Sequence, residues 1–160
     1  TYLTSRGNWY FTSWKGDEAK SGGIATNIGV HFYDMLAWIF GDVLESRVFA
    51  RDYDMNSGYL VFKHARVRWF LSVNYRYIPE ELKKSDVRTY RSITIEGEEL
   101  EFSGGFTDLH TETYKHILSG KGFGLEEAKP SINIVRDIRT MNVDKNSSGS
   151  DFHHPFLLGT

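Results

Sequence analysis

The residues best suited to chemistry lie at positions 21–34, which hold a Gly-Gly pair, Asn27, His31 and Asp34. Two glycines at a helix start leave backbone N–H groups free and let a ligand approach closely, and a helix N-terminus favours anions. Asn27 and His31 are four residues apart, so a regular helix places them on one face. Asp34 can orient the His31 ring through its second nitrogen. The pattern predicts an anion site beside a histidine acid or base.

Three basic residues, Arg6, Lys15 and Lys20, precede this segment. They supply the positive charge that a phosphate or carboxylate site needs. The same pattern also fits a purely structural role, in which the glycines pack closely on a sheet and His31 is a buried histidine with satisfied hydrogen bonds. The residues alone leave both interpretations open.

No other cluster predicts a metal or cofactor site. His110 and His116 lie six residues apart and therefore off a common helix face, and the histidine pair at 153–154 is adjacent in a tail. His31 with Asp34 would give only two ligands, so no metal site is predicted. Without cysteine, disulfides and thiolate catalysis are excluded. The chain contains no Gly-x-Gly-x-x-Gly fingerprint and no phosphate-binding P-loop.

Composition indicates one globular domain, residues 1–160, of 40% hydrophobic and 25% charged residues. A net charge of −2 argues against a broad nucleic-acid-binding surface. No apolar run is long enough to span a bilayer, so no membrane partner is expected. The opening residues have no signal-peptide pattern. A cytoplasmic setting is therefore expected.

The clearest predicted helix runs from Ile24 to a stop at Gly41. Its inward face is expected to carry apolar residues three, four and seven apart, namely Ile24, Ile28, Phe32, Met35 and Ile39. Before it, the aromatic-rich residues 2–14 predict one extended strand, with a possible interruption at 6–8.

The middle of the chain predicts antiparallel strands. Residues 66–75 alternate between apolar and polar side chains, with Phe70 as the exception, which is typical of a strand with one covered face. Residues 44–51 and 59–63 are its expected neighbours, and residues 92–95 and 99–102 flank a probable hairpin. The polar face of the predicted sheet is either exposed to solvent or a dimer surface. We expect a homo-oligomer formed through this open sheet face.

Two helices are expected near the C-terminal end. One runs from a cap at Thr107 or Asp108 to Ser119. The other begins near Glu126 with Pro130 in its first turn, and the residues expected to face inward are Ala128, Ile132, Val135 and Ile138. Residues 143–152 are predicted to be a flexible segment. The fold class expected from this order is α+β, an open, largely antiparallel sheet with helices on one face.

The segment from Lys15 through Ser21-Gly-Gly to Gly-Val-His31 and Asp34 resembles the second domain of the Gfo/Idh/MocA oxidoreductase family. Residues 109–118 and 122–139 are similar to the closing helices of that family, so the resemblance covers residues 2–156. Arg-Gly-Asn-Trp-Tyr at 6–10, followed by Ser-Trp-Lys-Gly-Asp at 13–17, resembles a subgroup, the bacterial UDP-N-acetylglucosaminuronate dehydrogenases. Members of that subgroup oxidise the sugar C3 hydroxyl with NAD on the way to surface polysaccharides.

The resemblance implies roles for single residues. His31 would be the general acid or base on the oxidised hydroxyl. Asn27 stands where many relatives have Asp, and it would hold a sugar hydroxyl or acetamido group without taking a proton. Arg6 and Lys15 would meet the pyrophosphate or the uronate carboxylate of a nucleotide-sugar substrate.

The family places a dinucleotide-binding Rossmann domain before this one, together with a Glu-Lys-Pro segment whose lysine assists proton removal. Neither is present in this chain, because Lys129-Pro130 lies in the last helices. We therefore expect an excised substrate-binding and oligomerisation domain, inactive alone. NAD(P) would be bound mainly by the absent N-terminal domain, with no cofactor expected in this fragment.

Two other functions remain open at this point. The chain could be a non-enzymatic sugar- or nucleotide-binding module of the same fold, or a homodimerisation scaffold whose helix pocket is vestigial. An upstream reading frame encoding a Gly-rich strand-turn-helix would favour the dehydrogenase.

Overall fold

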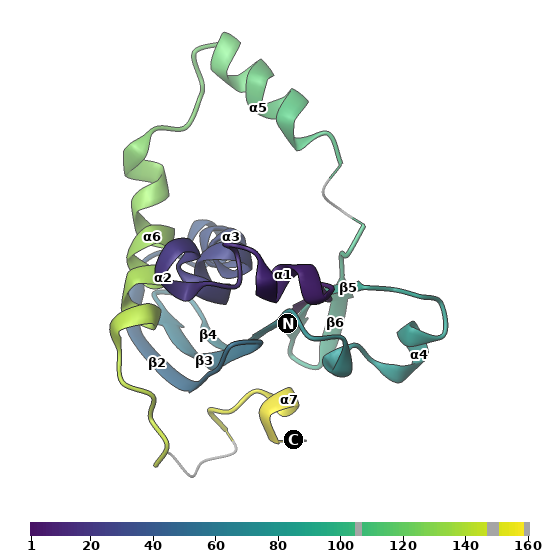
Figure 1. The fold of residues 1–160 in the computed structure, drawn as a ribbon. Coiled ribbons are helices and arrows are strands. Elements are labelled where there is room, and N and C mark those ends of the chain that lie inside the picture. Colours follow the sequence, from purple (N-terminus) through teal and green to yellow (C-terminus); the bar gives the residue numbers. More distant parts are fainter. Residues whose placement is uncertain (105–106, 147–150, 159–160) are drawn as a thin grey trace.

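A computed structural model of the chain describes residues 1–104, 107–146 and 151–158. In chain order its elements are β1 (Tyr2–Thr4), α1 (Asn8–Thr12), α2 (Glu18–Ser21), the π-helical turn η1 (Ala25–Gly29), α3 (Val30–Phe40), β2 (Val43–Arg51), β3 (Met55–Phe62), β4 (Arg66–Ser72), the 3-10 turn η2 (Tyr75–Tyr77), α4 (Glu80–Lys83), β5 (Thr89–Ile95), β6 (Glu98–Glu101), α5 (Leu109–Leu118), α6 (Leu125–Thr140) and α7 (Pro155–Leu158). Figure 1 shows this arrangement.

The strands form one six-stranded sheet in the order β2-β3-β4-β1-β5-β6. Neighbours pair antiparallel except β1 and β4, which run parallel. The short strand β1 therefore lies in the middle of the sheet, between two much longer strands. The expected α+β class with a largely antiparallel open sheet is confirmed, as is the hairpin β5–β6.

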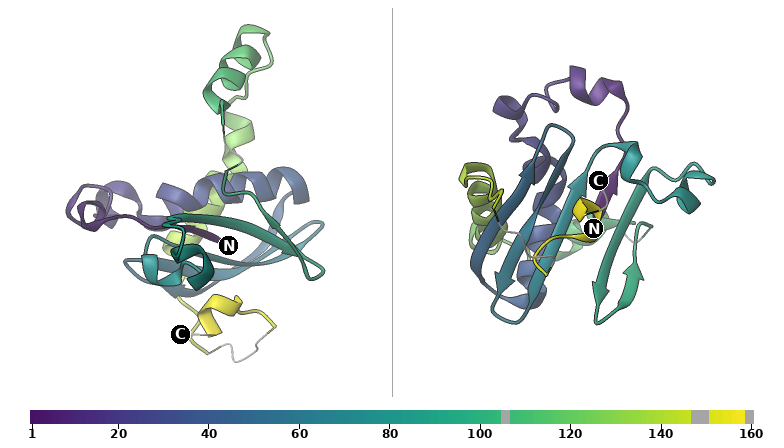
Figure 2. Two further views of the ribbon diagram at one scale, coloured as in Figure 1. Left: turned by 90° about the vertical axis from the view of Figure 1, so that its right-hand side faces the viewer. Right: turned by 90° about the horizontal axis from the view of Figure 1, so that it is seen from below.

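The long helices α3 and α6 cover one face of the sheet (Figure 2, left). The alternation along β4 is confirmed there, because Val67, Trp69 and Leu71 face the core under these helices. Trp69 meets Tyr33 of α3 edge-on, with ring centroids 5.6 Å apart. Burying such aromatic residues contributes strongly to the stability of the fold.

The opposite face of the sheet is partly covered by the C-terminal tail (Figure 2, left). Phe70, the exception in the alternating pattern, is fully buried there in a second apolar cluster. His154 and Phe156 of the tail stand against its ring, with centroids 5.6 and 5.5 Å away. This face is therefore less open than the sequence suggested, and a homo-oligomer formed through it stays a prediction.

The expectation of one strand over residues 2–14 is wrong. The strand ends at Thr4, and residues 8–12 form the helix α1. Aromatic residues suit strands, but here Tyr10 is buried in the core while its neighbours Trp9 and Phe11 point outward. A strand would also place Tyr10 inward and its two neighbours outward, so the aromatic pattern did not distinguish the helix from a strand.

The predicted helix over residues 24–40 is present, but its inward face is not the one expected throughout. Ile24, Ile28 and Phe32 are buried as predicted, whereas Ile39 is 49% exposed. The π-helical turn η1 widens the helix and shifts the phase of every later residue. Tyr33 and Leu36 consequently take the core positions.

The two C-terminal helices also differ from expectation. Helix α5 stands away from the sheet, and all its residues are exposed (Figures 1 and 2). The Asp108 side chain makes no capping hydrogen bond to α5. In α6 the buried residues are Ser131, Ile134, Val135 and Ile138, so Ala128 and Ile132 were wrongly expected inside. The first turns of α6 project beyond the sheet, and Pro130 lies within the helix rather than in its first turn.

The predicted flexible segment, residues 143–152, falls partly outside the described residues, which omit 147–150. At its start, Val143 packs against the core, and the Asp144 N–H donates to the carbonyl of Val48 in β2 at 2.8 Å. The described beginning of this segment is therefore attached to the sheet.

We expect Tyr33→Phe to raise the free energy of unfolding by about 1 kcal/mol. The Tyr33 hydroxyl is fully buried and has no hydrogen-bond partner within the described part of the chain. Removing it ends the desolvation cost without opening a cavity. Tyr10→Phe is the matched control, because that buried hydroxyl accepts a hydrogen bond from Asn27, and its loss should destabilise. Urea unfolding of both variants measures the difference; a loss of stability in Tyr33→Phe would contradict this account.

Candidate functional site

The side chain of Asn27 ties the start of the long helix to the loop that precedes it. Its Nδ2 lies 3.0 Å from the carbonyl oxygen of Gly23, 3.2 Å from that of Lys15 and 3.2 Å from the hydroxyl of Tyr10. These contacts engage the donor side of the amide within the protein. The carbonyl oxygen Oδ1 is the atom of Asn27 left for a ligand.

Ser21 makes a second tie to the same loop. Its hydroxyl donates to the carbonyl of Lys15 at 2.9 Å and accepts the N–H of Gly23 at 3.0 Å. The Gly22 N–H donates to the carbonyl of Glu18 and ends α2. The amides of both glycines are therefore used inside the protein. The expectation that the Gly-Gly pair offers bare N–H groups to an anion is wrong.

Glycine is required at position 22 for a conformational reason instead. Its φ is +79°, in the left-handed region, and a Cβ there would stand 2.3 Å from the hydroxyl oxygen of Thr26. The adjacent Gly23 has φ +72°. The pair turns the chain sharply from α2 into the long helix, which places Asn27 over the loop.

Tyr10 joins Arg6 to this arrangement. Burial raises the pKa of the Tyr10 hydroxyl, and the hydrogen bond from Asn27 and the positive charge of Arg6 partly oppose that rise. Arg6 is thus electrostatically coupled to the Tyr10–Asn27 pair. Tyr10 and Ser21 were not singled out from the sequence, although both lie in the motifs that carry the resemblance; their burial amid polar neighbours is the signal that marks them.

The two basic candidates remain open to solvent. Arg6 follows β1, and its backbone N–H donates to the carbonyl of Val73 at 2.9 Å, while the residue itself is exposed. The Lys15 ammonium lies 5.8 Å from the centre of the Trp14 ring. Asn27 and Ser21 hold the backbone of Lys15 rather than its side chain. Both cations are therefore available to an anionic ligand.

His31 is exposed on the first turn of α3, and Asp34 is exposed as well. Among the described residues no hydrogen bond or ion pair joins the two, so the structure does not show Asp34 orienting His31. The π-helical turn η1, which contains Asn27, also removes the regular four-residue alignment with His31 expected from the sequence. Arg6, Tyr10, Asn27 and the Lys15 backbone are brought together, and His31 lies one helical turn beyond them.

Within the described ranges, three or more potential metal ligands do not gather anywhere. The helices described there include none long and apolar enough to cross a membrane. A small cavity of about 170 Å³ adjoins the site, between the Lys15 loop, the glycine pair and the β2–β3 turn. Arg51 lies beside this cavity and donates to three carbonyls at the end of α6. These hydrogen bonds give Arg51 a structural role.

We expect Asn27→Asp to lower the free energy of unfolding by about 1–3 kcal/mol at neutral pH. A carboxylate cannot donate, so it would face the carbonyl oxygens of Lys15 and Gly23 without a hydrogen bond. Asn133→Asp is the matched control, because it makes the same change on the exposed side of α6. Thermal unfolding of both variants distinguishes them; equal small shifts would show that the Asn27 ties contribute nothing.

Comparisons with known proteins place the chain in a family. Residues 1–150 match the family profile described as the oxidoreductase family, C-terminal alpha/beta domain, of Gfo/Idh/MocA. A solved structure of the WlbA (WbpB) dehydrogenase from Thermus thermophilus, in complex with NAD and UDP-GlcNAcA, is 52% identical with a TM-score of 0.91. A second structure of that dehydrogenase, with NAD and alpha-ketoglutarate, is 54% identical with a TM-score of 0.91.

Both similarities cover 97% of this chain but only 49% and 50% of the solved chains, so the chain spans about half the length of these relatives. The resemblance seen in the Ser21–Asp34 segment thus extends over nearly all of this sequence. The chain belongs to the Gfo/Idh/MocA oxidoreductase family and has the fold of its C-terminal alpha/beta domain.

Proposed function

We propose that this chain is the substrate-binding half of an NAD-dependent dehydrogenase that oxidises a CH–OH group, the C3 hydroxyl of a UDP-N-acetylhexosaminuronic acid. The observation that carries the proposal is the 52% identity, over 97% of the chain, to a dehydrogenase crystallised with NAD and UDP-GlcNAcA. At this identity the chemistry of a site is commonly retained. The exposed His31 supplies an acid or base, and the exposed Arg6 and Lys15 supply positive charge.

His31 is the proton acceptor in this proposal. Oxidation of a secondary alcohol removes a proton from oxygen and a hydride from carbon, and NAD supplies the hydride acceptor when bound. An imidazole has an unperturbed pKa of about 6.5, so it takes and releases a proton near neutral pH. His31 is exposed on its helix, so the hydroxyl of a substrate can reach the ring.

In this proposal Arg6 and Lys15 bind the charged groups of the substrate. Both are exposed cations, and a guanidinium fork suits a carboxylate or a pyrophosphate oxygen pair. Trp9 and Trp14, on the same segment, are 53% and 58% exposed. Large exposed aromatic side chains beside two cations indicate a surface that binds a ligand or a neighbouring domain.

The residues of this chain fit only one side of an NAD site. They include no glycine-rich dinucleotide fingerprint, and the amides of Gly22 and Gly23 are already used. We therefore place the dinucleotide mainly on a cofactor domain outside this chain, with His31 facing the reacting end. NAD rather than NADP is proposed because the similar structures contain NAD.

The direct test measures NADH formation by the intact protein, supplied with NAD and UDP-N-acetylglucosaminuronate. Reduction of NAD is expected with this substrate and much less with UDP-N-acetylglucosamine, which lacks the carboxylate. The proposal fails if the intact protein binds the uronate in calorimetry without ever reducing NAD. That result would favour the binding-module alternative.

A further inference from the structure

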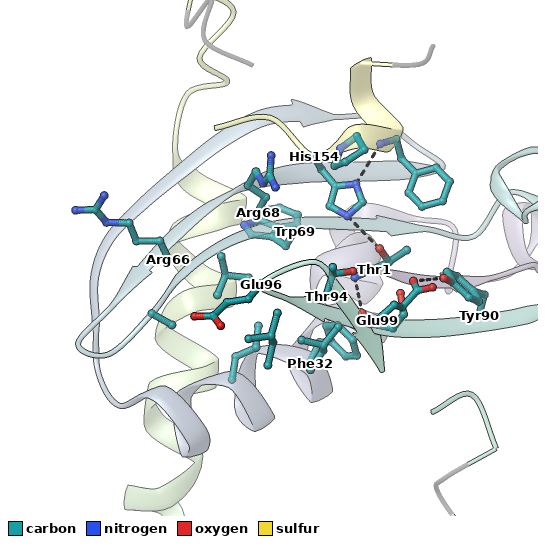
Figure 3. Close-up of a pocket in the computed structure, with 18 of the residues that line it drawn as sticks. Thr1, Phe32, Arg66, Arg68, Trp69, Tyr90, Thr94, Glu96, Glu99 and His154 are labelled. Carbon is teal, nitrogen blue, oxygen red and sulfur yellow. Dashed lines mark hydrogen bonds between the residues drawn. The ribbon is translucent and has the colours of Figure 1, made fainter. Parts of the chain in front are cut away.

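The proposed function does not use a cavity of about 760 Å³ inside the sheet (Figure 3). It lies between β4 and β5 beyond the first residue of β1. Its walls come from the two strands, from helix α3 and from the C-terminal tail; they include Phe32, Arg68, Trp69, Thr94 and His154.

The sheet register shows what shape this cavity has. Tyr2 pairs with Leu71 of β4 and with Arg91 of β5. If β1 continued towards its N-terminal side, its next three positions would stand opposite Trp69 and Ile93, then Arg68 and Thr94, then Val67 and Ile95. Those stretches of β4 and β5 flank the cavity, and in the described sheet they do not pair with each other.

The hydrogen bonding of β1 continues to the edge of the cavity. Thr1 exchanges both main-chain hydrogen bonds with Ser92, at 2.9 and 3.0 Å. In an antiparallel pair such hydrogen-bonded residues alternate, so the next one on β5 is Thr94. The Thr94 N–H and carbonyl therefore point into the cavity and suit a further residue of the same strand.

The two sides of the cavity differ in polarity. Towards the helices it is lined by the apolar side chains of Phe32, Leu36 and Phe40. Towards the other face it meets Arg68 and the His154 ring (Figure 3). A β-strand with alternating apolar and polar residues has this polarity, because successive side chains point to opposite faces.

The group now at the edge of the cavity is the Thr1 amine, and burial lowers its pKa to about 5, with Glu99 partly opposing the shift. A charged ammonium is disfavoured at this place, whereas a peptide N–H would donate to the Ser92 carbonyl without charge. The position is therefore better suited to a peptide bond than to a free amine.

We propose that this cavity holds an extended peptide segment that continues β1 on the N-terminal side of Thr1, parallel to β4 and antiparallel to β5. The segment adds about three residues, roughly 10 Å, at about 3.3 Å per residue. Apolar residues at its first and third positions face α3, and the second is polar. The added strand joins the two halves of the sheet, and it brings the preceding chain in beside the β5–β6 turn.

The proposal is tested by extending the chain before Thr1 with Val-Thr-Val and, as a control, with Val-Pro-Val. The central residue of either extension stands opposite Thr94, and proline removes the N–H that would pair there. The Thr94 N–H would donate to the carbonyl of the central residue, and proline weakens docking of the segment by removing the partner bond to the Thr94 carbonyl. Amide exchange of Thr94 is therefore expected to be about tenfold slower with Val-Thr-Val than with Val-Pro-Val, the effect of one net hydrogen bond. Both extensions remove the buried Thr1 amine, so the melting temperature should rise with both, and by more with Val-Thr-Val.

Equal exchange at Thr94 in both extended chains would overturn the proposal. Protection that increases with protein concentration would also overturn it, because the strand would then come from a second copy. The measurement does not involve NAD or the sugar, so its failure is distinguishable from failure of the proposed function.

Discussion

In the intact enzyme, His31→Asn is expected to lower kcat by about 10²–10⁴-fold while the affinity for NAD stays nearly unchanged. The reason is the position of His31, exposed on the first turn of α3. It lies just beyond the Tyr10–Asn27 pair and the Arg6 charge coupled to it. The substrate is bound across that cluster in our proposal, so the reacting hydroxyl meets the imidazole. In the same proposal the dinucleotide rests mainly on a domain outside this chain, so the change leaves its binding site intact.

The measurement is steady-state kinetics over a range of pH, with NAD affinity determined separately by calorimetry. Loss of the imidazole should also remove one limb of the pH–rate profile, since the titrating group is gone. His110→Asn is the matched control, because His110 is exposed on the distant helix α5. A His31 variant with unchanged kcat and a raised KM would show a binding residue instead of an acid or base.

The sheet was predictable because its signal is local and periodic. In β4 the alternation of apolar and polar residues directly reflects which side chains point at the helices. The hairpin β5–β6 was equally clear, since Gly97 takes a positive φ in its turn. The place of β1 between β4 and β5 could not be read in this way, because three residues carry no period.

The helix that bears the site shows the limit of periodicity. A π-helical turn is not visible in the spacing of apolar residues, yet it rotates everything after it. Tyr33 and Leu36 are therefore buried, Met35 is only partly buried against the core and Ile39 is exposed. The turn also removes the regular alignment of Asn27 with His31. Such turns are frequent at functional sites, where they reposition a side chain.

The predicted roles of the glycines and of Asn27 illustrate a second limit. Residue types indicated that amides and cations lie near position 22. They did not indicate which donors are already used, because that depends on the fold of the Lys15 loop over the helix start. The carbonyl of Lys15 accepts hydrogen bonds from both the Ser21 hydroxyl and the Asn27 side-chain amide. Which of these donors and acceptors are paired is decided by the tertiary fold and not by the residue types.

Acid is expected to destabilise the 160-residue chain through His154. This ring of the tail is buried against the sheet, and burial together with the positive charges of the Thr1 amine and Arg68 lowers its pKa to about 3. The Phe156 N–H lies 3.2 Å from Nδ1, so Nδ1 is the acceptor and Nε2 carries the proton towards the Thr1 hydroxyl at 3.0 Å. The folded protein therefore holds the neutral ring.

The unfolded chain has an ordinary histidine, with a pKa of about 6.5. Between about pH 6.5 and 3 the unfolded state binds a proton that the folded state does not, so the free energy of unfolding falls as the pH falls. Each pH unit below 6.5 costs up to about 1.4 kcal/mol, or roughly 3 kcal/mol by pH 4.5. The Thr1 amine, with its pKa lowered to about 5, acts in the same direction from about pH 8 downwards.

Urea unfolding at several pH values between about 7 and 4.5 measures this loss. His154→Gln should flatten the pH dependence, because glutamine donates towards Thr1 and accepts from Phe156 without titrating. His64→Gln, on the exposed β3–β4 turn, should keep the slope of the unchanged chain. An identical slope in the His154 variant would place the acid sensitivity elsewhere. Extending the chain before Thr1 removes the amine and its charge, so the same experiment on the Val-Thr-Val chain should show a shallower slope than the unextended one.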